Sequence, residues 1–344
     1  MPYLDHKDLL LAVLDGEFVD KPPVILPSGL VSRPIDSVLD SEGLRLDELH
    51  SDSKKLSKLS LAVQSATQVE SLAMPFVLTV ESEAYGGESE ESVASTKPTI
   101  FRYPFKKVYE ICTLEKLDPL TSDRLPVVID TLKELKGKSE ELNLPLIGDL
   151  VAPLSLASTL VDAGAILKAM AKKDSVVNDS LDLLAQGSEA FASEMIRAGV
   201  DCFCIVDPIS TVNILGAKFF ELYTVPYLNR LTEFCHSLEK PVIVHLCGSL
   251  EKLPIDMLSA DCISLDSENS LEFISSIADD FVVMAGPDDK ALSGCSVELQ
   301  EGARELVSNG VRILSSSCAL TGGVNPTNLK ALVESSYLIA EEAE

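Results

Sequence analysis

The stretch Pro241-Val-Ile-Val-His-Leu-Cys-Gly248 carries the clearest information about how this chain folds. Its first residues form a continuous apolar run, which is typical of a strand that is buried on both faces of a parallel sheet. The run ends in His-Leu-Cys, and Gly248 then allows the chain to turn. We therefore expect a buried parallel strand with polar, reactive side chains at its carboxyl end.

Seven further short runs share this character, because each is rich in Val, Ile and Leu and is bounded by Pro, Gly or Asp. They are Val24–Pro27, Ala73–Leu78, Leu144–Leu150, Cys202–Val206, Cys262–Leu265, Phe281–Ala285 and Val311–Ser315. Apolar residues at helical spacing lie between them, in Ser53–Glu70, Asp174–Ala198, Gln300–Val307 and Asn325–Ala340. Alternating strands and helices indicate βαβ units, and eight such units predict an α/β fold of the (β/α)8 TIM barrel type. A doubly wound open sheet is the alternative.

Two segments do not fit the regular alternation. Residues 85–111 contain Gly86, Gly87 and an acidic, serine-rich run, and then alternate through Thr99–Tyr103. We interpret them as a hairpin inserted over the barrel mouth. Residues 28–50 are expected to form a second, N-terminal excursion after the first strand. No linker or shift in composition divides the chain, so residues 1–344 are predicted to form a single barrel domain.

The charge of the chain argues against several classes of partner. Its 344 residues include 54 acidic and 28 basic side chains, which gives a formal net charge of −26. Phosphate backbones and anionic membranes would be repelled, so neither nucleic acid nor membrane is an expected partner. No apolar stretch approaches the roughly 18 residues of a membrane span. Residues Met1–Leu14 lack the basic region of a secretory signal, and we predict a cytoplasmic protein.

The end of the quoted strand contains a candidate metal site. His245 and Cys247 are two residues apart, so in a strand both side chains point to one face and can reach the same ion. Cys318 follows the last predicted strand, and barrel closure would bring the carboxyl ends of both strands to one mouth. Three ligands leave one position open, which is the pattern of a catalytic zinc site. The alternative is a His-x-Cys pair that only fills the core.

The other cysteines are predicted to be free thiols, since disulfides are rare in this compartment. Cys202 and Cys204 form a second pair with strand spacing. Asp207 ends this strand and is expected to face the mouth, which would point Cys202 and Cys204 outward to the helices. The remaining four have no spacing typical of metal ligands; they are Cys112, Cys235, Cys262 and Cys295.

Several motifs outside the candidate metal site complete a recognisable pattern. They are Asp20-Lys-Pro-Pro-Val24, Leu78-Thr-Val-Glu-Ser-Glu-Ala-Tyr-Gly86, Ala152-Pro-Leu-Ser-Leu-Ala157 and Val206-Asp-Pro208. With these residues the sequence resembles the uroporphyrinogen decarboxylase superfamily over nearly its whole length. Within that superfamily it is most similar to the zinc-dependent methylcobamide:coenzyme M methyltransferases. The resemblance implies that His245, Cys247 and Cys318 bind zinc, and that the zinc binds an acceptor thiol.

The resemblance also implies a reaction, the transfer of a methyl group from a methyl-Co(III) corrinoid to a thiol such as coenzyme M. A free alkyl thiol is mostly protonated near pH 7, whereas a thiol that coordinates zinc is deprotonated and can attack. The sequence lacks a corrinoid-binding stretch of the Asp-x-His-x-x-Gly type, so the methylated corrinoid is expected to arrive on a separate corrinoid protein.

Four carboxylates end or follow predicted strands and could orient His245 or take up the proton of the thiol. They are Glu83, Asp149, Asp207 and Asp266. The resemblance favours Glu83 and Asp266 as the catalytic pair.

Two other functions remain open at this stage. A metal-free lyase of the uroporphyrinogen decarboxylase type would need arginines near the first strand to bind its polyanionic porphyrin, and Pro22–Ser32 contains none. A non-catalytic subunit that binds corrinoid or zinc on the same scaffold is the second alternative.

Overall fold

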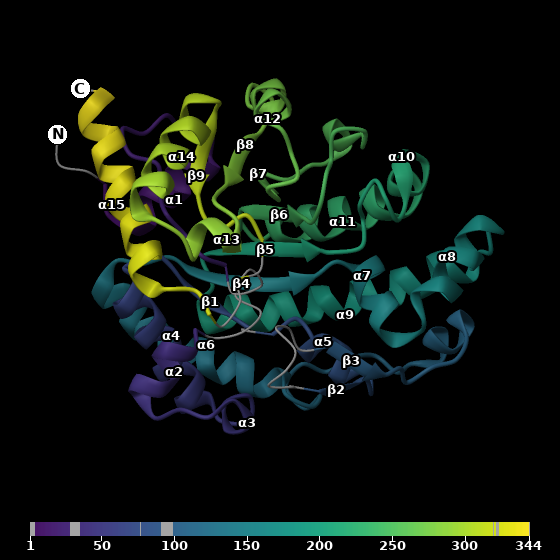
Figure 1. The fold of residues 1–344 in the computed structure, drawn as a ribbon. Coiled ribbons are helices and arrows are strands. Elements are labelled where there is room, and N and C mark those ends of the chain that lie inside the picture. The colour runs from purple at the N-terminus through teal and green to yellow at the C-terminus, as the bar shows by residue number, and fades with distance from the viewer. Residues whose placement is uncertain are drawn as a thin grey trace.

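A parallel sheet that curls into a barrel forms the centre of the computed structural model, which describes residues 4–27, 35–75, 77–90, 99–318, 320 and 323–343 (Figure 1). Seven strands are hydrogen-bonded in the order β1-β4-β5-β6-β7-β8-β9, and every neighbouring pair is parallel. Their bounds are Leu72–Met74, Leu146–Val151, Cys202–Asp207, Val242–Leu246, Cys262–Leu265, Val282–Ala285 and Val311–Leu314. The predicted α/β barrel is confirmed.

The first predicted strand is shortened to a single residue that closes the barrel. Val24 forms a parallel bridge with Leu314 in β9. The Ile25 N–H donates to the Leu314 carbonyl at 3.0 Å, and the Glu70 N–H donates to the Val24 carbonyl at 2.8 Å just before β1. Val24 therefore spans the gap between the last and first strands of the sheet, and we call this contact the barrel seam.

Helices surround the sheet and lie where apolar residues recur at helical spacing. The main ones are α4 (Ser53–Thr67), α6 (Leu125–Leu142), α7 (Pro153–Leu160), α8 (Ala163–Ala171), α9 (Val176–Ala198), α11 (Val225–His236), α12 (Leu271–Ile277), α14 (Ser296–Ser308) and α15 (Pro326–Ala343). In α9, for example, Val177, Leu181 and Leu184 are buried, and Gly199 ends the helix in the left-handed conformation. The four predicted helices are all present, with ends that match or differ by up to four residues.

Both predicted insertions lie at the carboxyl end of a strand. The N-terminal excursion contains α2 (Asp36–Glu42) and α3 (Leu46–Leu49), while residues 28–34 lie outside the described ranges. After β1, the chain forms α5 (Val80–Ala84) and then an antiparallel pair, β2 (Glu88–Glu90) with β3 (Thr99–Arg102). Residues 91–98, between these two strands, are outside the described part of the hairpin.

The two faces of the sheet pack against different partners. The inner face includes Ile147, Ile243, Met284 and Ile313, and α1 (His6–Leu14) adds Leu10, Val13 and Leu14 to this cluster. The backbone N–H of Lys7 donates to Asn143, just before β4, so α1 covers the amino ends of the strands. The outer face packs against the helices and includes Phe203, Ile205, Val242 and Val244.

Cys202 and Cys204 belong to the inner cluster, so the prediction that they point to the helices is wrong. That prediction assumed that Asp207, at the end of β5, faces the mouth. Asp207 instead lies on the outer face, where its carboxylate accepts a hydrogen bond from Ser155 in α7. Because successive side chains of a strand point to opposite faces, this single error reversed the predicted direction of every side chain in β5.

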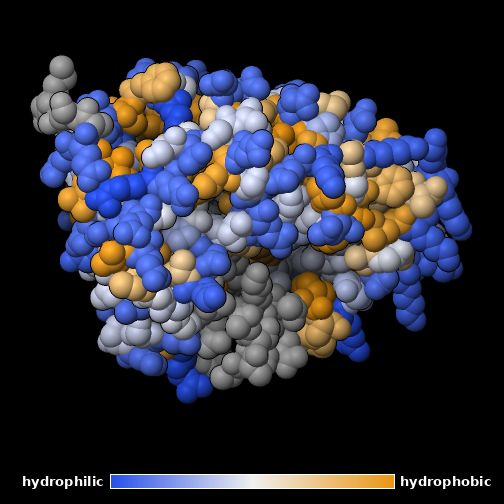
Figure 2. Space-filling model, turned by 45° about the horizontal axis from the view of Figure 1, so that its top comes forward, coloured by the Kyte–Doolittle hydropathy of each residue, from blue (hydrophilic) through white to orange (hydrophobic). Residues whose placement is uncertain are grey.

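Hydrophilic residues cover most of the face seen in Figure 2, with apolar residues scattered among them. Within the described ranges, no single helix combines the length and the apolar composition of a membrane span. Helices α7 and α8 meet both criteria only as a pair, which is bent by 120°.

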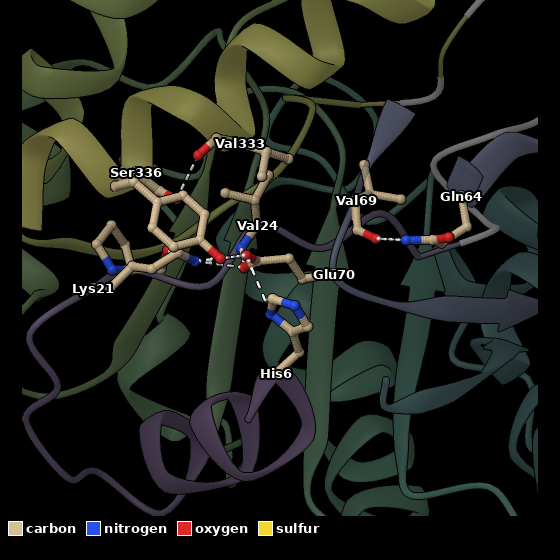
Figure 3. Close-up of polar contacts among 10 residues, drawn as sticks. His6, Lys21, Val24, Gln64, Val69, Glu70, Val333 and Ser336 are labelled. Carbon is tan, nitrogen blue, oxygen red and sulfur yellow. Dashed lines mark hydrogen bonds and ion pairs between the residues drawn. The ribbon is translucent and has the colours of Figure 1, made fainter. Parts of the chain in front are cut away.

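A buried ion pair lies beside the barrel seam. Lys21 and Glu70 are each only 1% exposed, and the Lys21 Nζ is 2.7 Å from both carboxylate oxygens of Glu70. Figure 3 shows His6 and the backbone of Val24 also converging on Glu70, with the Val24 N–H donating at 2.9 Å and His6 Nδ1 at 3.3 Å. The Tyr337 ring of α15 lies 4.5 Å from the Lys21 Nζ. One carboxylate thus connects α1, the seam and the last helix.

These donors control the protonation of Glu70. Burial on its own would raise the pKa of the carboxyl, but the hydrogen bond from His6, the charge of Lys21 and the Val24 N–H together hold that pKa below its ordinary value. The carboxylate therefore stays charged in the folded protein across the neutral and mildly acidic range.

Glu70→Gln should lower the free energy of unfolding by about 3–5 kcal/mol, because it leaves the buried Lys21 without its counter-charge. The loss should be full above the ordinary carboxyl pKa and should shrink as pH falls toward the depressed pKa of Glu70, where the wild type also loses the charge. Urea unfolding at several pH values measures both effects.

The matched control is Glu48→Gln, since Glu48 pairs with Lys55 on the surface and is half exposed. This change should cost less than about 1 kcal/mol. If both variants lost the same free energy of unfolding, burial of the ion pair at the seam would add nothing to stability.

Candidate metal centre

Strand β6 brings His245 to the inner face of the barrel near its carboxyl end. In the sheet, His245 is flanked by Val206 on β5 and Ser264 on β7. It follows Ile243 of the inner cluster by two residues, and its side chain is fully buried. Cys247, two residues further, lies just beyond the end of the strand and is partly exposed.

Ser264 fixes the orientation of the imidazole. His245 Nδ1 is 2.9 Å from Ser264 Oγ, and His245 Nε2 is 3.6 Å from Cys247 Sγ. When Nδ1–H donates to Ser264, Nε2 is unprotonated and available as a metal ligand. Sequence reasoning missed Ser264, because only the register of β6 against β7 shows that the two residues are neighbours.

The turn after Cys247 is held by the loop that follows β7. Gly248 has φ +71°, a left-handed conformation that favours glycine, and its N–H donates to Asp266 Oδ2 at 3.1 Å. The Asn269 side chain donates to the Gly248 carbonyl at 3.0 Å and accepts from the Leu250 N–H at 2.8 Å. These contacts fix where the Cys247 thiol lies.

Cys318 is positioned by backbone contacts between the ends of β8 and β9. The Ser315 N–H donates to Ala285 at 3.1 Å, and the Ser317 N–H donates to Pro287 at 3.0 Å. Between them, a Cβ on Gly286 would lie 1.6 Å from the Ser315 carbonyl oxygen, so only glycine permits this approach. The chain beyond β9 is thereby held against β8, and Cys318 reaches the mouth.

The three side chains meet at a spacing that suits zinc. Cys247 Sγ lies 3.8 Å from Cys318 Sγ and 3.6 Å from His245 Nε2, and one ligand atom from each residue lies within 4.8 Å of the others. Tetrahedral zinc, with bonds of about 2.3 Å to sulfur and 2.0–2.1 Å to nitrogen, needs sulfurs about 3.8 Å apart and sulfur and nitrogen about 3.6 Å apart. The group could therefore hold a metal ion such as zinc, and both of its cysteines are partly exposed.

The two carboxylates favoured at the mouth lie in different surroundings. Glu83, on α5, accepts a hydrogen bond from Arg124 Nε at 2.6 Å and another from Ser89 of the hairpin. Asp266 accepts from Gly248 and from Ser267 Oγ at 3.2 Å. Neither carboxylate is the hydrogen-bond partner of His245 Nδ1; that partner is Ser264. Their catalytic roles stay predictions.

The other two carboxylates, Asp149 and Asp207, are almost fully buried. Asp149 lies on the inner face beside Cys204, and burial followed by the charge of Asp149 raises the pKa of the Cys204 thiol. Burial likewise raises the pKa of Asp207 on the outer face, although a hydrogen bond from Ser155 opposes the shift.

Glu81 is a buried carboxyl group that sequence reasoning missed. It lies on α5 with 2% exposure and accepts hydrogen bonds from the Val151 N–H at 2.7 Å and from Ser188 Oγ at 3.1 Å. Burial raises its pKa to about 7 despite these donors. Glu81 thus connects α5, the end of β4 and α9, and it holds the helix that carries Glu83.

This chain, a parallel barrel with a His, Cys, Cys set at its mouth, also matches a known protein family. The family model described as uroporphyrinogen decarboxylase (URO-D) matches residues 5–337, and the chain belongs to this family of enzymes.

Individual relatives are similar to the chain over its full length. It is 26% identical over 343 residues to the methylcobamide:CoM methyltransferase MtaA of Methanosarcina barkeri, covering 95% of this chain and 96% of that one. It is 23% identical to MtbA of Methanosarcina mazei, with the same two coverages. A solved structure described as a methyltransferase from Methanosarcina mazei superposes with a TM-score of 0.87 at 25% identity, covering 97% of this chain and 99% of that one. The uroporphyrinogen decarboxylase of Staphylococcus carnosus is 34% identical over 169 residues, which is 45% of this chain and 47% of that one.

The purified protein should contain about one zinc ion per chain, and Cys318→Ala should lose it while the far-ultraviolet circular dichroism stays unchanged. Ser264→Ala should weaken zinc binding about 10- to 100-fold, since it removes the partner that orients His245. Elemental analysis and competition with a chelator provide the measurements. Cys112→Ala, which removes an exposed thiol, is the control and should bind zinc normally. Unchanged zinc content in Cys318→Ala would contradict the site.

Glu81→Gln should change how stability depends on pH. The raised pKa means that wild-type Glu81 is neutral in the fold at low pH and costs stability as pH rises from the ordinary carboxyl pKa to about 7. Gln remains neutral and can still accept from Val151, so the variant should gain relative stability over this range, on the order of 3 kcal/mol by pH 8. Urea unfolding between pH 4.5 and pH 8 measures the difference, with Glu134→Gln as an exposed control; parallel curves for wild type and Glu81→Gln would disprove the expectation.

Proposed function

We propose that this chain, as a single methyltransferase domain, transfers a methyl group from a protein-bound methyl-Co(III) corrinoid to a small thiol such as coenzyme M. The observation that carries the proposal is the spacing of the His245, Cys247 and Cys318 ligand atoms, which suits zinc. Similarity to MtaA over 95% of the chain supports the same reaction.

In this proposal, His245 Nε2, Cys247 Sγ and Cys318 Sγ hold the zinc ion. A bound zinc ion supplies a Lewis acid that keeps the sulfur of the acceptor thiol deprotonated near neutral pH. Two thiolates and a neutral imidazole add two negative charges to the site, so the acceptor sulfur remains electron-rich. Ser264 keeps the imidazole in the required tautomer, and the Gly248 turn holds the Cys247 thiol in place.

The reaction itself moves a methyl group between two external molecules. An electron pair of the acceptor sulfur forms the new S–CH3 bond, and the electrons of the Co–C bond stay on cobalt, which becomes Co(I). The role of the protein is to position the two molecules. Cys247 and Cys318 follow strand ends and are partly exposed, and we infer that acceptor and methyl donor approach them from the barrel mouth.

We assign Asp266 and Glu83 to the handling of the thiol proton and the shape of the mouth. Asp266 is two residues beyond Ser264 on the same chain segment and contacts the turn that follows Cys247. Glu83 is 9% exposed and is held beside the hairpin by an ion pair with Arg124. Both carboxylates therefore lie on segments that follow strand ends, where barrel enzymes place their chemistry.

Two alternatives, a metal-free decarboxylase and a non-catalytic subunit, can be distinguished from this proposal by the assay described in the next paragraph. A porphyrinogen lyase has no use for a His, Cys, Cys set. A purely structural zinc would be closed by four protein ligands, whereas the described residues supply three.

The test is an assay of methyl transfer from free methylcobalamin to a panel of thiols that includes coenzyme M. The reaction is monitored by the loss of the absorbance of the cobalt–carbon bond. The wild type should be active, and Cys318→Ala or prior chelation should lower the rate at least about 100-fold, with zinc restoring the chelated wild type. Asp266→Asn and Glu83→Gln should lower kcat while zinc content stays normal. Full activity in metal-free protein, or turnover of uroporphyrinogen without methyl transfer, would overturn the proposal.

A further inference from the structure

The rim of the barrel mouth carries a surface that the proposed chemistry does not use. Three segments build it: β3 (Thr99–Arg102), η2 (Val108–Thr113) and α8. The first two follow β1 in the chain, and α8 follows β4 through α7, so all three lie at the carboxyl side of the barrel, as the metal centre does. Figure 1 shows the β2–β3 hairpin and α8 on the same side of the molecule as α7.

Contacts along η2 make this surface continuous. η2 packs against both α8 and α9. Near its start, the Phe105 N–H donates to the Leu160 carbonyl at 3.1 Å, just before α8 begins. Near its end, Cys112 Sγ lies 3.4 Å from Ser180 Oγ in α9, beyond the end of α8. η2 therefore lies against α8 as well as α9, with hydrogen-bonded contacts before the start and beyond the end of α8.

This surface is basic in a chain that is otherwise strongly acidic. Residues 99–116 hold four basic and two acidic side chains, and residues 163–173 hold three basic and no acidic ones, between Asp162 and Asp174. Five exposed lysines, which we call the lysine rim, have no carboxylate within ion-pair distance among the described residues. They are Lys106, Lys107, Lys168, Lys172 and Lys173.

The nearest acidic side chain on η2 is already engaged with the backbone. The Glu110 carboxylate accepts the N–H groups of Lys106 and Lys107, each at 2.8 Å. These hydrogen bonds, that of Lys107 first, lower the pKa of Glu110. Glu110 therefore caps the turn instead of pairing with the lysine side chains, and their charges stay directed to solvent.

Exposed aromatic rings lie among these charges. Phe101 is 59% exposed, Tyr109 is 52% exposed and Tyr103 is 42% exposed. The Lys107 Nζ lies 5.6 Å from the Tyr109 ring. Exposed aromatics next to cations are typical of protein interfaces, where rings supply contact area and charges supply orientation.

We propose that the lysine rim, with Phe101, Tyr103 and Tyr109, docks an acidic face of the corrinoid-carrying protein. The inference rests on the proposed function, which requires a large methyl donor at the mouth. A net charge of −26 repels an acidic protein from the molecule as a whole, whereas the five exposed lysines of the rim attract one locally. Docking there places the carrier beside the metal centre and orients it before contact.

The experiment compares two methyl donors, free methylcobalamin and a purified methylated corrinoid protein of net negative charge. Lys106→Glu with Lys107→Glu, and Lys172→Glu with Lys173→Glu, should each lower kcat/KM for the protein donor at least about tenfold and weaken its salt dependence. Neither double variant should change the rate with free methylcobalamin. Lys133→Glu with Lys138→Glu, on the exposed face of α6, changes the charge equally and should leave both rates near wild type.

Direct binding separates failure of this inference from failure of the proposed function. Calorimetry with the demethylated corrinoid protein should show binding that the rim variants lose, even if no methyl transfer is found and the proposed function fails. Wild-type binding or protein-donor kinetics in both rim variants would overturn the inference. So would sedimentation showing that the rim holds a second copy of this chain, or rim-dependent binding to vesicles containing 30% phosphatidylserine.

Discussion

Closure of the barrel at Val24 is the constraint on which the rest of this structure depends. Seven parallel strands leave a gap between β9 and β1, and one residue bridges it with hydrogen bonds to both sides. Such a short strand contributes few backbone bonds, so side chains must stabilise the seam. The buried pair of Lys21 and Glu70 does this, because the same carboxylate also binds the Val24 N–H. Removing either partner of a buried pair leaves an uncompensated charge, so the closed seam depends on both side chains.

The metal centre exists because the barrel is closed. His245 and Cys247 come from β6 and Cys318 follows β9, with β7 and β8 between them in the sheet. In a flat sheet those strand ends would lie about 14 Å apart, since neighbouring strands are about 4.8 Å apart. Curvature brings the two thiols to 3.8 Å. A metal ion bound there would connect β6 to β9 across the mouth, so metal affinity and barrel stability are coupled.

Charge is distributed unevenly around this mouth. Buried carboxyls on α5 and β5 carry raised pKa values because burial disfavours their charge. Glu83, also on α5, forms an ion pair with Arg124. The excess of acidic residues lies on the outside and repels anions over most of the surface. The lysine rim interrupts this field beside the reactive end of the barrel. In the proposed docking, a donor carried by an acidic protein would meet attraction beside the site where methyl transfer is proposed.

The sequence alone determined the alternation of apolar strands and helices, and hence the barrel, because burial on both faces leaves a continuous apolar run. It also determined the i, i+2 pair of His245 and Cys247 and their distant partner Cys318. Tertiary structure alone decided which face of β5 is inside, since Asp207 at a strand end gave the wrong direction for Cys202 and Cys204. It alone revealed Ser264 on His245 Nδ1 and the backbone contact at Gly286, because both depend on the register between neighbouring strands, which no local pattern encodes.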